Sequence, residues 1–177
     1  MKKAIRIILF ILLVIIIFIS TFLFVKLQLS YLKGEKSYSK LSQYVKKPSN
    51  KSPSKKPSGS HSKVPQGPPR EDIEWPMVDF EGLLKINDDL VGWIYIDGTN
   101  VDYPIVHGPD NNFYLYKMFD GNYNRSGSIF MDGANSADFS DKHTLIHGHH
   151  MKNDTMFSGL PKYKDQQFYA QHPVVLI

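Results

Sequence analysis

Residues 91–106 read V-G-W-I-Y-I-D-G-T-N-V-D-Y-P-I-V, and this stretch decides the fold that we expect. It holds two runs rich in β-branched and aromatic residues, Val91–Ile96 and Val101–Val106, on either side of Asp97–Asn100. Two such runs around a four-residue turn that contains glycine predict a β-hairpin. Because Pro104 has no backbone N–H to donate, we expect the second strand to lie at an edge or to have an interrupted ladder.

Short strands and short helices are expected on both sides of this hairpin. Before it, Phe80, Leu83 and Leu84 fall on one helical face. After it, the sequence predicts a capped short helix at 110–115, a strand at 128–131, a strand that begins at 144, a helix start at Asp154, a helix over 165–171 and a strand over 174–177. This mixture predicts a mostly β barrel or sandwich, and the folded domain is expected to cover residues 71–177.

The N-terminal part of the chain predicts a membrane anchor. Ile7–Val25 is a run of nineteen residues without a charge, and a helix of this length spans roughly the 30 Å hydrocarbon core. Lys2, Lys3 and Arg6 precede it, which favours a cytoplasmic N-terminus at residues 1–6. The run is longer than the apolar region of a signal peptide, and no small-residue cleavage site follows it. We therefore expect a single-pass anchor in the cell membrane, with the domain outside.

Charge is segregated along the rest of the chain. Residues 26–45 form the expected juxtamembrane segment, and its mixed polar part, Tyr31–Val45, can continue as a helix. Residues 46–70 hold seven basic residues, no acidic residue and little that is apolar, so a disordered linker is expected. Residues 71–177 hold sixteen acidic and seven basic residues, so the positive net charge of the whole chain, +4, comes from the residues before them. A basic run can bind nucleic acid, but its position outside the membrane argues against that partner.

The histidine-rich stretch Thr144–Phe157 is the candidate site, because it carries three of the seven histidines within four residues. A histidine just beyond a buried strand has its backbone held by the sheet and its ring free to face a cleft. Imidazole titrates near pH 6.5, so such a ring can give and take a proton. The alternative is a solvated loop without function.

Five motifs along the chain carry a resemblance to a known family. They are G-W-I-x-I-D-G-T-N-V-D-Y-P-I-V (Gly92–Val106), D-N-x-x-Y-L (Asp110–Leu115), G-S-I-F-M-D (Gly127–Asp132), H-G-H-H-M-K-x-x-T-M-F (His147–Phe157) and L-x-x-Y-x-x-x-x-F-x-x-x-H-P (Leu160–Pro173). Their content and order resemble class B sortases over roughly residues 78–177. The anchor and the basic linker also suit that family, whose members sit on the outer face of Gram-positive membranes.

The resemblance implies a cysteine transpeptidase on an eight-stranded β-barrel, without a cofactor or a metal. The family's Cys thiolate attacks the Thr carbonyl of an Asn-Pro-x-Thr-type sorting signal, and an amine of the peptidoglycan then resolves the thioester. His149 matches the family's catalytic histidine, which acts as general acid and base. Asn111 and Leu115 match positions beside the groove that binds the sorting signal.

The sequence departs from the family in its chemistry. It contains no cysteine, and Arg125, the single arginine of the expected domain, matches no catalytic position. We therefore expect the N-terminal portion of a class B sortase, or a truncated and inactive one, with a barrel that is incomplete at the C-terminus.

Two other functions stay open. His143, His147 and His149 share strand parity, so a His-based metal hydrolase is one of them. Met151 and Lys152 stand where a zinc site of the His-x-His-x-Asp-His kind needs an aspartate and a histidine, which argues against it. The other is a membrane-tethered extracellular binding module without enzymatic activity, which the missing cysteine favours.

Overall fold

The structure, a computed structural model, describes residues 2–46 and 76–177. The elements in order are α1 (Lys2–Leu41), η1 (Ser42–Tyr44), β1 (Val45–Lys46), β2 (Met77–Val78), α2 (Phe80–Leu84), β3 (Leu90–Tyr95), β4 (Asp102–Val106), β5 (Ile129–Met131), β6 (Ile146–His147), η3 (Phe157–Lys164) and α3 (Gln166–Gln171). The linker expected at residues 46–70 lies outside the described residues, except for Lys46, which ends β1.

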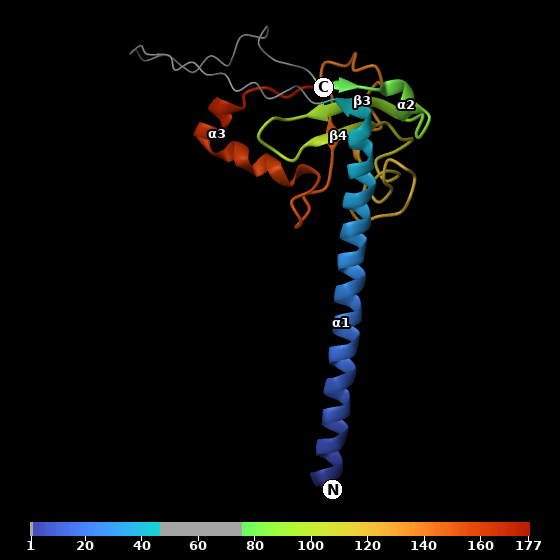
Figure 1. Cartoon of the computed structure of the whole chain (residues 1–177), viewed down its shortest axis with the longest axis vertical. Coiled ribbons are helices and arrows are strands. Elements are labelled where there is room, and N and C mark those ends of the chain that lie inside the picture. The colour runs from blue at the N-terminus through green and yellow to red at the C-terminus, as the bar shows by residue number, and fades with distance from the viewer. Residues whose placement is uncertain (1, 47–75) are drawn as a thin grey trace.

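Helix α1 is a single 40-residue helix whose N-terminal end extends far from the rest of the chain (Figure 1). By length and composition, it is apolar enough to cross a membrane. Its most apolar segment is not buried against the rest of the described residues. The helix expected over Tyr31–Val45 extends as far as Leu41, where η1 follows. Leu41 and Val45 are buried, so the C-terminal end of α1 and the residues just after it pack against the domain.

The hairpin that the sequence predicts forms one side of a four-stranded sheet with the order β3-β4-β5-β6. Strands β3 and β4 are antiparallel, with Trp93 opposite Pro104. Strand β4 is not an edge strand, because β5 pairs with it in parallel at Ile105 and Val106. The pairing with β5 does not extend to Pro104, which explains how a residue without an N–H is accommodated inside the sheet.

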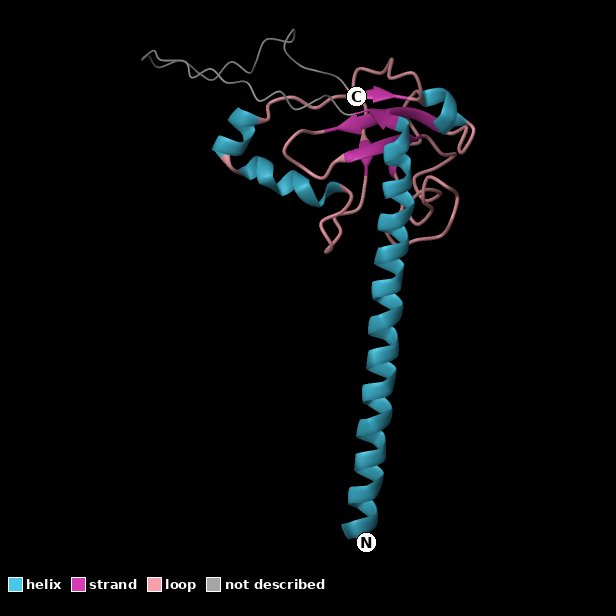
Figure 2. Cartoon of the chain, viewed as in Figure 1, coloured by secondary structure: helices cyan, strands magenta, loops and turns pink. Residues whose placement is uncertain are grey.

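The expected closed β-barrel is not formed by the described residues. Their strands make the open four-stranded sheet and a separate β1–β2 pair, and neither sheet closes on itself. The expectation of a mostly β chain is also wrong, because the longest strand has six residues whereas α1 alone has 40. Figure 2 shows the strands gathered at one end of α1, with helices and long loops around them.

Two apolar clusters hold the sheet to its surroundings. The first joins the end of α1 to β3 and to the loop after β4, and its largest members are Trp93, Tyr114, Phe119 and Phe130. The second contains Ile94, Ile105, Ile129 and Met131 from the strands, together with Met156. Residues adjacent in the strands fall in different clusters, as expected where successive side chains point to opposite faces of a sheet.

Several local predictions need correction. Asp110 accepts hydrogen bonds from the backbone N–H groups of Asn112 (2.7 Å) and Phe113 (2.9 Å), but the segment forms turns instead of a helix. Asp154 does not begin a helix, since its φ is 56° and η3 begins at Phe157.

Two predictions near the C-terminus have different outcomes. The helix expected at 165–171 is confirmed, with Asp165 as the N-cap of α3. The strand expected at residues 174–177 is reduced to one bridge, in which Leu176 pairs with Tyr95.

Candidate active site

The candidate site begins where β6 ends, at His147. Strand β6 pairs with β5 so that His147 lies opposite Phe130, and the two rings stack with centroids 5.1 Å apart. The Nε2 atom of His147 lies 2.9 Å from Oδ2 of Asp132, the residue that follows β5. The sheet register therefore brings together two polar residues that are 15 positions apart in the sequence.

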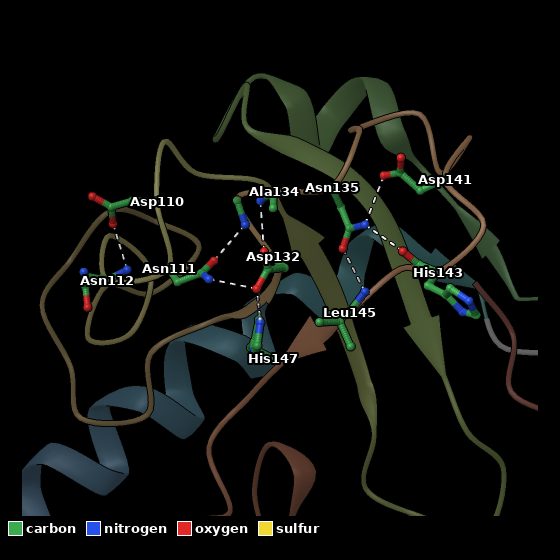
Figure 3. Close-up of polar contacts among 11 residues, drawn as sticks. Asp110, Asn111, Asn112, Asp132, Ala134, Asn135, Asp141, His143, Leu145 and His147 are labelled. Atoms are coloured by element: carbon green, nitrogen blue, oxygen red, sulfur yellow. Dashed lines mark hydrogen bonds and ion pairs between the residues drawn. The ribbon is translucent and has the colours of Figure 1, made fainter.

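Asp132 is the centre of a small polar network (Figure 3). Its Oδ1 accepts a hydrogen bond from the backbone N–H of Ala134 (2.9 Å), and its Oδ2 accepts one from Nδ2 of Asn111 (2.8 Å). The Ala134 N–H, together with His147 and Asn111, holds the pKa of the Asp132 carboxyl below its usual value. Asn111 also accepts a hydrogen bond from the N–H of Gly133 at 2.7 Å. The network therefore fixes Asn111 and His147 to the same carboxylate.

His149 lies two residues further on and faces a different partner. Its Nε2 is 2.7 Å from the carbonyl oxygen of Leu115, and its ring lies 5.6 Å from the ring of Tyr116, centroid to centroid. A carbonyl oxygen only accepts, so Nε2 carries the hydrogen in this contact. His149 is half-buried, whereas His150 is exposed. The contact joins the histidine motif to the end of the D-N-x-x-Y-L motif.

Gly148 allows this close arrangement between the two histidines. A Cβ atom at this position would lie 2.4 Å from Cδ1 of Ile129 and 2.8 Å from Cδ2 of Phe157. The loop beyond it returns to the site, because the N–H of Phe157 donates to the carbonyl of His149 at 3.0 Å. The His149 carbonyl is therefore tied to the first residue of η3.

The three residues that the sequence predicted for the site lie in two neighbouring groups. Leu115 contacts His149 directly through its carbonyl oxygen, whereas Asn111 binds Asp132 and reaches His147 through that carboxylate. Sequence reasoning gave no role to Asp132 or Tyr116. The signal for Asp132 was its place directly after a buried strand, but the strand register that pairs it with His147 cannot be predicted from local sequence.

The third histidine of the proposed metal set does not share this network. The carbonyl of His143 accepts a hydrogen bond from Asn135 in the preceding loop, which is separate from the Asp132 contacts in Figure 3. Within residues 2–46 and 76–177, no group of three or more His, Cys, Asp or Glu side chains has an arrangement that could hold a metal ion.

Comparisons with known proteins agree on one family. The chain is 44% identical to the sortase B of Listeria monocytogenes over 95 residues, and 43% identical to that of Staphylococcus aureus over 96 residues. The homologues of this chain are class B sortases. Each match covers 54% of this chain and 39% of the relative, so the chain spans about four tenths of the length of these class B sortases.

Solved structures of class B sortases also share the fold. The crystal structure of sortase B from Bacillus anthracis matches 83% of this chain and 61% of its own, with a TM-score of 0.61 and 31% identity. A structure of Staphylococcus aureus sortase B matches 54% of this chain and 41% of its own, with a TM-score of 0.52 and 43% identity. No protein-family profile matches the chain. A cysteine transpeptidase is the activity that these relatives suggest, and the 177 residues contain no cysteine.

Proposed function

We propose that this chain supplies the histidine side of a class B sortase active site, with His149 as the general acid and base. The observation that supports this most is the 2.7 Å contact between His149 Nε2 and the Leu115 carbonyl. It holds the ring at Nε2 and leaves Nδ1 to exchange a proton with a thiol. A proton-transfer role needs a ring held in one orientation, and the half-buried position of His149 meets that need.

The reaction follows from this arrangement once a cysteine is supplied. The sulfur must come from outside the 177 residues, because none of them is cysteine. Its thiolate attacks the Thr carbonyl of an Asn-Pro-x-Thr-type signal, the Thr peptide bond breaks, and His149 protonates the departing amine. A peptidoglycan amine then attacks the thioester, His149 accepts its proton, and the thiolate is released. By itself, the 177-residue chain neither cleaves nor transfers a sorting peptide.

Asn111 and Leu115 have different parts in binding the sorting signal. Leu115 contacts His149 through its carbonyl oxygen, and its half-buried side chain packs against the first apolar cluster, so its backbone borders the groove close to the reacting bond. Asn111 is held by Asp132 and Gly133, so it positions the wall of the groove.

The chain acts at a membrane surface. Helix α1 spans the bilayer through Ile7–Val25, and Lys2, Lys3 and Arg6 keep the N-terminus in the cytoplasm. The domain is then extracellular, where sorting signals and peptidoglycan amines meet it.

The test is a chimera in which this chain is followed by the cysteine-containing C-terminal region of the Listeria monocytogenes relative. The His149→Ala variant is expected to lose acyl transfer by about 100-fold or more, as for a general acid and base. The matched control is His150→Ala, which should cost far less because His150 is exposed. The His147→Ala variant should fall between them, because it loses its contacts with Phe130 and Asp132. Equal losses at His147 and His149, with bound zinc lost in both, would instead support the metal hydrolase.

A binding module without catalysis is the second candidate, and the absence of cysteine favours it. It predicts that the chimera binds a sorting peptide but forms no acyl-enzyme, whatever residue stands at position 149.

A further inference from the structure

The C-terminal half of α1 is fastened to the loop after β4 by contacts at Ser30, Gly34 and Ser37, which we call the seam. The loop residue Asn124 donates a hydrogen bond from Nδ2 to the carbonyl of Ser30 (2.8 Å), and Ser37 donates one to Asp120 (2.7 Å). Between them, the buried Gly34 lets the helix approach closely, since a Cβ there would lie 3.0 Å from Oγ of Ser126. These contacts dock the loop on the C-terminal half of α1.

The seam fixes the height of the loop above the apolar part of α1. Ser30 follows Val25 by five residues, which is about 8 Å along a helix axis. The headgroup region beyond the hydrocarbon core is about 5–8 Å thick on each side of a bilayer. If α1 spans the membrane, as proposed above, Asn124 lies at the level of the headgroups. Figure 1 shows the gold loop beside α1, nearer to its N-terminal end than the sheet is.

The loop displays side chains that suit this level. Tyr123 is 79% exposed, which is unusual for an aromatic side chain within a folded domain. Tyrosine is enriched where a protein meets the membrane–water interface, because its ring is apolar and its hydroxyl is polar. Arg125, two residues further on, is also exposed and carries a positive charge. Gly121, with φ of 80°, makes the turn that projects this segment.

A hollow of about 340 Å³ lies between this loop and α1, and its charge favours an anionic partner. It is lined by Lys33, Lys36 and Lys40 from one face of the helix, and by Asn122 and Tyr123 from the loop. Helical side chains lean toward the N-terminus, so these lysines lean toward the bilayer.

Asp120 also lines the hollow. Among the described residues that line it, Asp120 is the one with a carboxylate. Partial burial raises the pKa of Asp120, but hydrogen bonds from Ser37 and Asn122 outweigh that effect and lower it. Asp120 therefore stays charged and is already bound to α1 through Ser37, which leaves the three lysines in excess.

We propose that residues 121–125 and the lysines beside them on α1 form a contact with the surface of an anionic phospholipid bilayer. Tyr123 enters the headgroup layer, and Lys33, the lysine of the hollow nearest the apolar run, binds lipid phosphates. The contact also sets the position of the candidate active site, because Tyr123 lies 6.2 Å from Tyr116 and Tyr116 lies 5.6 Å from His149, between ring centroids. The site is thereby held close to the membrane surface.

The test uses the full chain in lipid nanodiscs of phosphatidylcholine with phosphatidylglycerol. The chain has no cysteine, so Asn122→Cys introduces a single position for a nitroxide label. A Tyr169→Cys variant is the control, because Tyr169 is exposed on α3, far from the seam. A nickel-chelating lipid at headgroup level should relax the label at 122 several-fold more strongly than the label at 169.

The loop side chains give the second comparison. In the labelled Asn122→Cys chain, Tyr123→Ser should lower the relaxation, and Tyr169→Ser should leave it unchanged. Omitting phosphatidylglycerol should lower the relaxation of the label at position 122 further, because the lysines lose their anionic partners. This effect of phosphatidylglycerol should be absent in a K33Q/K36Q/K40Q variant. Equal relaxation at 122 and 169 in nanodiscs that hold the chain would overturn this contact alone. A chain that does not integrate into nanodiscs would overturn the anchor as well.

Discussion

Replacing Gly148 with alanine tests how the candidate site is built. The new Cβ would lie 2.4 Å from Cδ1 of Ile129, and Ile129 is completely buried in β5. A second clash, at 2.8 Å, involves the ring of Phe157 at the start of η3. Neither neighbour can move without disturbing the core, so the cost is that of overpacking, about 1–3 kcal/mol of unfolding free energy.

The matched control is Gly92→Ala in β3. The nearest atom to a Cβ at Gly92 is Cζ of Phe139 at 3.4 Å, an ordinary contact distance. This variant should change the unfolding free energy by less than about 1 kcal/mol, or stabilise the chain slightly through its unfolded state. Urea unfolding of the full chain in detergent measures both. A Gly148→Ala chain as stable as Gly92→Ala would refute the packing that we describe around His147 and His149.

Three further predictions concern the seam, the polar network and α3. Tyr38→Phe removes the 2.7 Å hydrogen bond to the Gly127 carbonyl and should lower the unfolding free energy by about 1–2 kcal/mol. The loss should be seen as faster hydrogen exchange in residues 126–131, and unchanged exchange would contradict the docking of α1. Because the folded-state pKa of Asp132 is lowered, its carboxylate stabilises the fold above pH ~4, and this contribution is lost as the pH falls through the lowered pKa. Asp132→Asn should therefore flatten the acid limb of a stability–pH profile, and an unchanged limb would argue against the network. Asp165→Ala removes the N-cap of α3 and should cost about 1 kcal/mol in thermal unfolding, with Asp88→Ala, in an exposed turn, as the neutral control.

The parts of the fold that were predictable are those set by neighbouring residues. The hairpin follows from the turn at Asp97–Asn100, the cap of α3 from Asp165, and α1 from an uninterrupted apolar run. Local chemistry misled at Asp154, where a good capping residue adopts a positive φ and leaves the start of η3 to Phe157.

The residues proposed for the site come from motif resemblance, and their contacts could not be predicted from the sequence. The motif resemblance pointed to His149, Asn111 and Leu115, and the structure places Leu115 against His149. The pairing of Asp132 with His147 depends on the register between β5 and β6, and a local sequence pattern does not determine which residues of two strands face each other. The closed barrel was expected from the family, whereas the described residues contribute four strands to an open sheet.

The most direct test of the central proposal is the intact mass of the chimera after incubation with an Asn-Pro-x-Thr peptide. Our account predicts an added mass equal to the N-terminal fragment of the peptide, bound as a thioester and released by a peptidoglycan-like amine. The adduct should form in the His150→Ala chimera and be about 100-fold slower to appear in the His149→Ala chimera. An adduct that forms equally fast without His149 would contradict the account.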